Sequence, residues 1–92
     1  MYITRNHKKL LYNIKKLQEN GVKRISAATI FSCKPNGKKY HTLRELTKLD
    51  CIMYEGGSWQ LTPFGCEIVA EFELQQFAYA LRFKYNQENN VQ

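Results

Sequence analysis

A Gly-Gly pair at positions 56–57 constrains the fold of this chain more than any other feature of its sequence. Apolar and polar residues alternate on both sides of the pair, with the apolar positions at Ile52, Tyr54, Trp59 and Leu61. Consecutive glycines can adopt the positive φ angles of a type I′ turn, whose twist matches that of paired strands. The turn then sets Tyr54 opposite Trp59, and we expect both rings to pack inward. The sequence therefore predicts a two-stranded β-hairpin over residues 52–61.

A basic amphipathic helix is predicted directly before the hairpin. Its apolar positions recur at three-residue steps, at Tyr40, Leu43, Leu46 and Leu49. Two starts are open: Asn36 can cap a helix over residues 37–49, whereas Thr42-x-x-Glu45 has the form of a capping box that would start the helix later. We favour the earlier start, because it gives about three turns and keeps Tyr40 on the apolar face.

Two other helices are predicted nearer the N-terminus. The first begins at a cap formed by Thr4 or Asn6, ends at Gly21, and carries a buried stripe at Leu10, Leu11, Ile14 and Leu17. His7 lies in its first turn, and we expect this side chain to be solvated because the sequence offers it no partner. The second helix is short, covers residues 27–31 and is capped by Ser26.

The segments that flank the short helix are predicted to be a link and a turn. Residues 22–25 form a short link that could pair with the hairpin. Residues 34–37 read Lys-Pro-Asn-Gly, and each of the last three residue types favours a turn. These elements form one domain over residues 1–85, which is mainly α with a small β-hairpin, an α+β class.

A long C-terminal helix is predicted from about residue 63 to about residue 85. Thr62-Pro63 supplies a cap followed by proline in the first turn, where its missing N–H costs nothing. The apolar residues that follow cover more than one face, so this helix is either wrapped by its own domain or paired with a second copy of the chain. We favour a homodimer, whose seam runs through Ala70, Leu74, Phe77 and Leu81. Residues 86–92 are polar and are predicted to form a flexible tail.

Charge is divided unequally along the chain, whose net charge is +6. Residues 1–48 hold twelve Lys and Arg against two Glu, a net +10, and residues 49–92 carry a net −4. Ordinary surfaces mix their signs, so this division favours a polyanionic partner such as nucleic acid for the first half.

Other classes of protein are disfavoured by the sequence. The three cysteines, Cys33, Cys51 and Cys66, have no paired metal-ligand spacing, and we expect them to be free thiols in a reducing compartment. No nucleophile, base or phosphate-binding loop has informative spacing, so we expect neither an enzyme nor a cofactor. The sequence has no long apolar run and no secretory leader, and a cytoplasmic protein without membrane contact is expected.

Two motifs give the chain a resemblance to a known family. Residues 43–52, reading LRELTKLDCI, and residues 61–65, reading LTPFG, resemble the end of the recognition helix and the segment after the wing in winged helix-turn-helix domains. The order of predicted elements also agrees. The family includes bacterial, archaeal, viral and plasmid transcription regulators. The resemblance implies sequence-directed binding of double-stranded DNA, commonly as a homodimer, with the third helix in the major groove.

The expected DNA contacts lie on the third helix and the turn before it. They are Lys34, Lys38, Lys39, His41, Thr42, Arg44 and Lys48. Asp50 stands where many relatives have glycine, so either this residue adopts the left-handed region or the helix ends differently. The wing carries Glu55 and no Lys or Arg, so we expect it to be structural. The alternative function is a protein-interaction or assembly module that uses the apolar C-terminal helix, and no effector site can be located from the sequence.

Overall fold

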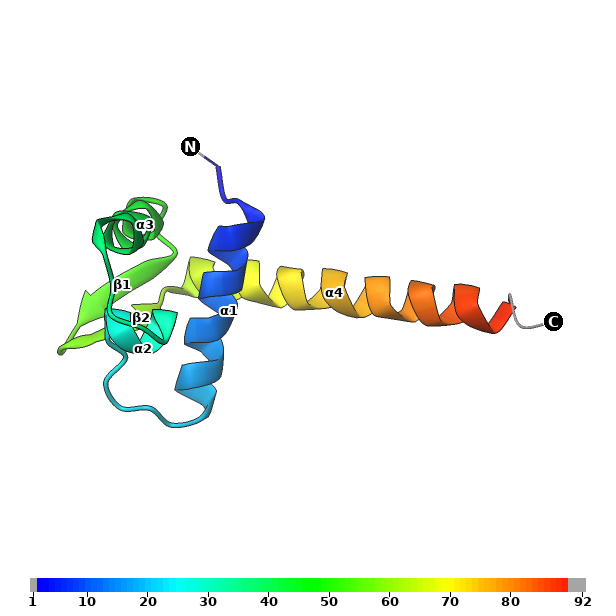
Figure 1. The fold of residues 1–92 in the computed structure, drawn as a ribbon, viewed down its shortest axis with the longest axis horizontal. Coiled ribbons are helices and arrows are strands. Elements are labelled where there is room, and N and C mark those ends of the chain that lie inside the picture. Colours follow the sequence, from blue (N-terminus) through cyan, green and yellow to red (C-terminus); the bar gives the residue numbers. More distant parts are fainter. Residues whose placement is uncertain (1, 90–92) are drawn as a thin grey trace.

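The computed structural model describes residues 2–89 and the side chains of residues 2–82 (Figure 1). In this part of the chain the elements are α1 (Arg5–Glu19), α2 (Ala27–Phe31), α3 (Gly37–Lys48), β1 (Ile52–Glu55), β2 (Ser58–Leu61) and α4 (Pro63–Asn89). The two strands form an antiparallel sheet. The expected class, mainly α with a small β-hairpin, is confirmed.

The hairpin has the predicted turn and the predicted register. Gly56 and Gly57 have φ angles of 60° and 79°. Tyr54 pairs with Trp59, and the strand residues at the other end of the hairpin pair as expected. The link before α2 lies along β2, because the Trp59 N–H donates to the Ile25 carbonyl at 2.9 Å. One expectation is wrong: the Tyr54 ring does not pack inward and is 60% exposed.

The helix caps follow local sequence signals. The Thr4 side chain accepts a hydrogen bond from the His7 N–H and caps α1. The Asn36 side chain accepts from the Lys39 N–H at 3.1 Å, so α3 has the earlier of its two possible starts. Thr42 lies inside this helix, where its hydroxyl donates to the Lys38 carbonyl at 3.0 Å. Asp50 follows α3 with φ 61°, so of the two alternatives the left-handed conformation is the one observed.

The core lies where α1, α2, α3, the hairpin and the start of α4 meet. Its fully buried large side chains are Leu11, Ile14, Ile25, Leu43, Leu46, Ile52 and Val69, together with Cys51. Tyr40 was expected to share the apolar face of α3 with Leu43 and Leu46, but its side chain is 46% exposed and the core does not cover it. Its ring lines a cleft that α2 and the hairpin leave open, so these elements do not close over it.

The junction between the hairpin and α4 is closely packed. The Thr62 hydroxyl donates to the Asp50 carbonyl and accepts from the Gly65 N–H at 3.0 Å. The Thr62 N–H donates to the Cys51 carbonyl at 3.1 Å. Gly65 lies so close to the segment after α3 that a Cβ built on it would be 2.0 Å from the Cys51 oxygen. These contacts fix where α4 leaves the domain.

The helix α4 extends far beyond the rest of the fold. Its first turns pack on α1, where Lys15 and Glu73 form an ion pair that raises the pKa of the lysine amine. Its later turns project away from the other elements (Figure 1), and the described chain is 56 Å along its longest axis. The helix ends at Asn89, after the expected residue 85, and residues 90–92 of the expected tail lie outside the described residues. Within the described part, no helix is long and apolar enough to cross a membrane.

The three cysteines are expected to differ in reactivity. Cys33 and Cys66 are exposed, whereas Cys51 is buried. Burial and the neighbouring Asp50 carboxylate both raise the pKa of the Cys51 thiol, which keeps it protonated and unreactive. Titration of the native protein with Ellman's reagent should give two fast thiols and a third only in guanidinium. Three fast thiols would mean that the junction between the hairpin and α4 opens in the native state.

Candidate nucleic-acid interface

The face of α3 that points away from the core is basic. Leu43 and Leu46 anchor the opposite face in the core. Four of the expected contact residues lie exposed on α3: Lys38, His41, Arg44 and Lys48. Within residues 2–82 none of the three Lys and Arg among them takes part in an ion pair. Lys34 is exposed in the turn before α3. Most of this positive charge is therefore presented by a helix, and Lys34 adds to it from the preceding turn.

Lys39 differs from the other expected contacts because it points back towards α2. Its ammonium donates to Cys33 Sγ and lies 5.6 Å from the centroid of the Phe31 ring. The side chain is half-buried. To reach a phosphate, this ammonium would have to leave both contacts.

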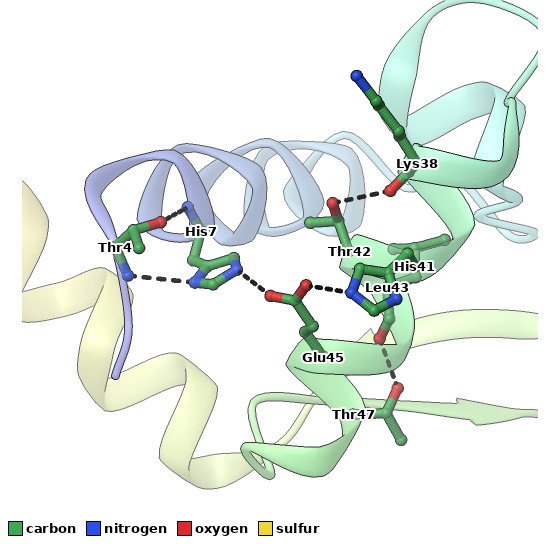
Figure 2. A network of polar contacts seen from close by, with 8 residues as sticks. All are labelled: Thr4, His7, Lys38, His41, Thr42, Leu43, Glu45 and Thr47. Carbon is green, nitrogen blue, oxygen red and sulfur yellow. Dashed lines mark hydrogen bonds and ion pairs between the residues drawn. The ribbon is translucent and has the colours of Figure 1, made fainter. Parts of the chain in front are cut away.

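Two other expected contacts are engaged within α3. His41 Nε2 lies 2.7 Å from Glu45 Oε1. The Thr42 hydroxyl is bonded to the Lys38 carbonyl one turn earlier (Figure 2), and the side chain is half-buried. The polar groups of these two side chains already have partners within α3, so they are less available to contact DNA than the side chains of Lys38 and Arg44.

The glutamate Glu45 joins α3 to the start of α1 (Figure 2). Its Oε2 lies 3.1 Å from His7 Nε2, and the His7 Nδ1 accepts a hydrogen bond from the Thr4 N–H at 3.1 Å. Since Nδ1 accepts, Nε2 carries the proton and donates a hydrogen bond to the carboxylate. The expectation that His7 is solvated is therefore wrong: the residue is 7% exposed and binds both its own helix cap and α3.

Part of this arrangement has a local signal in the sequence. Thr4-x-x-His7 has the spacing of a capping box, with histidine in the position that Glu or Gln usually takes. Glu45 lies 38 residues further along the chain, and no local pattern pairs it with His7. The pairing matters for the interface because it engages one oxygen of the only acidic side chain on α3 and fixes the helix against α1.

The hairpin also has basic neighbours, which were not among the contacts expected from the sequence. Ile25 donates its N–H to Ser58 Oγ at 2.8 Å and accepts from the Trp59 N–H. Lys23 and Arg24, both exposed, directly precede Ile25. They lie within about 7 Å of chain from the edge of the hairpin. The sequence predicted that the link could pair with the hairpin, and this pairing already implied that Lys23 and Arg24 lie near the hairpin.

Comparisons with models of known protein families, with curated proteins and with solved structures gave no match for this chain.

Proposed function

We propose that the chain is a winged helix-turn-helix protein that binds double-stranded DNA as a dimeric transcription regulator. In this proposal α2 and α3 form the helix-turn-helix, the hairpin is the wing, and α3 enters the major groove. The order of elements, the basic N-terminal half and the motifs at residues 43–52 and 61–65 support it.

The observation that carries the proposal is the exposed basic face of α3. In this proposal Lys38, near the start of α3, and Lys48, at its end, contact phosphates, and Arg44 lies between them along the helix. An arginine can read guanine through two parallel hydrogen bonds to O6 and N7. A helix held by core leucines and by the His7–Glu45 contact presents these groups in one orientation.

The chain offers a matched pair of arginines for testing this face. Arg44 and Arg82 are both exposed and both helical, but Arg82 lies on the projecting part of α4. We expect Arg44→Ala to weaken binding to a selected duplex by about 5- to 150-fold, and Arg82→Ala to change it less than about 2-fold. The duplex is first selected from fragments of the source genome, and affinity is then measured by fluorescence anisotropy. Equal losses of affinity in Arg44→Ala and Arg82→Ala would show that α3 does not contact the DNA.

A second candidate function is a protein-interaction or assembly module. The observation that favours it is the exposed apolar stripe on α4, which includes Leu74 and Phe77. Ionic strength separates the two functions. Affinity for duplex DNA falls steeply as salt rises, because log affinity plotted against log salt concentration has a slope of about −0.9 for each phosphate contact. The affinity of an apolar interface barely changes with salt concentration.

A further inference from the structure

An aromatic cleft opens beside α3, between that helix and the hairpin. It has a volume of about 360 Å³ and is lined by Ser26, Ala27, Tyr40, Tyr54 and Trp59. The lining residues come from the start of α2, the first turn of α3 and both strands. Ligand sites in proteins occupy about 300–1,000 Å³. The cleft lies at the lower end of that range, which suits a single planar group.

The rings of this cleft are accessible from solvent. Tyr54 and Trp59 lie with their ring centroids 5.0 Å apart and their planes at 57°. Tyr54 is 60% exposed and Tyr40 is 46% exposed. The core is closed by the aliphatic residues beneath, so these two tyrosines are not needed to fill it. Two exposed tyrosine rings beside the half-buried Trp59 form an apolar patch of the kind that often marks contact with a partner.

The charge around the cleft favours an anionic partner. Arg24 is exposed two residues before Ser26, about 7 Å of extended chain from the lining of the cleft. Lys23 precedes it and is also exposed. Glu55 is next to Tyr54, but successive side chains of a strand point to opposite faces, so its carboxylate belongs to the other face of the hairpin. A cationic ligand in the aromatic cage would meet these basic groups, whereas a nucleotide would place its phosphate near them.

We propose that the cleft formed by Tyr40, Tyr54 and Trp59 holds an unpaired nucleobase that projects from the nucleic acid bound at α3. The inference rests on the proposed DNA binding and deepens it. An aromatic ring can stack on the face of any base. This stacking does not depend on contacts in the grooves of a duplex. The wing then contacts the nucleic acid through its aromatic rings and through Lys23 and Arg24, rather than through basic residues of its own.

Trp59 is the only tryptophan of the chain, so its emission reports directly on this cleft. The test compares a fully paired duplex with the same duplex carrying one single-base bulge, each labelled at one end. Anisotropy of the label measures binding, and Trp59 emission measures occupation of the cleft. We expect quenching of Trp59 and about 5- to 150-fold tighter binding for the bulged duplex only.

Two variants test the stacking itself. Tyr54→Ala should abolish the preference for the bulged duplex, and Tyr54→Phe, which keeps the ring, should retain it. Because the Tyr54 side chain is largely exposed, neither change removes a core contact. The preference of each variant is the ratio of its affinities for the bulged and the paired duplex.

The outcomes distinguish this inference from the proposed function. Binding of both duplexes with equal affinity and equal Trp59 emission would overturn the inference and leave duplex binding in place. Binding of neither duplex would overturn both. Quenching by a proline-rich peptide, with no preference for the bulge, would assign the cleft to a protein partner and overturn the inference.

Discussion

Gly65→Ala is expected to destabilise the protein by about 3 kcal/mol or more, enough to lower Tm by at least about 12 °C. The added Cβ would lie 2.0 Å from the Cys51 carbonyl oxygen, and that oxygen belongs to backbone that cannot rotate away. It also accepts the Thr62 N–H, so displacing it breaks the bond that seats α4. Alanine favours a helix by about 1 kcal/mol over glycine, which offsets only part of the cost. Thermal unfolding followed by circular dichroism measures the effect.

Gly37→Ala is the matched control for this substitution. Gly37 also lies in the first turn of a helix, and a Cβ there has no atom within 4 Å. Its stability should be unchanged or raised by up to about 1 kcal/mol. In Gly65→Ala, Cys51 should also react rapidly with Ellman's reagent, because the junction that covers it is opened. A Tm for Gly65→Ala equal to that of Gly37→Ala would show that the junction yields without cost.

The elements that could be predicted from the sequence are those that depend on neighbouring residues. The Gly-Gly turn, the cap at Asn36 and the Thr62-Pro63 start of α4 each satisfy backbone groups within a few residues. The strand register follows from the turn, since a two-residue loop fixes every pair after it. The left-handed conformation of Asp50 was one of two alternatives for the end of α3, and it is the one observed. Each of these features depends only on residues that are close together in the sequence.

The features that could not be predicted depend on residues that meet only in the fold. His7 is buried because Glu45 lies opposite it, and Gly65 is required because Cys51 passes beside it. The exposure of Tyr40 and Tyr54 has the same origin: a three-residue period shows which residues share a face but not whether another element covers that face. The candidate site was therefore predicted as a basic helix, while its aromatic cleft was not.

Replacing Leu74 and Leu81 by glutamine is expected to convert a dimer into a monomer. These residues are 68% and 52% exposed, and Phe77 between them is 64% exposed. With Ala70 they recur at steps of four and three residues, the spacing of a helix seam. In the dimer, Leu74 and Leu81 of both copies would be covered, four leucines in all. Their replacement should therefore weaken association by more than about 1,000-fold. Light scattering should then report a mass near 10.9 kDa instead of twice that value.

Tyr79→Gln is the control for the α4 stripe, because Tyr79 is 70% exposed but lies on roughly the opposite side of the helix. This variant should remain dimeric. If α4 joins two copies, Leu74→Gln/Leu81→Gln should bind a duplex with two half-sites much more weakly than the parent, and a single half-site equally well, because only the linkage between the two α3 helices is lost. A parent protein that is monomeric at micromolar concentration would exclude the seam. Equal mass for both variants and the parent at twice 10.9 kDa would place the dimer contact elsewhere.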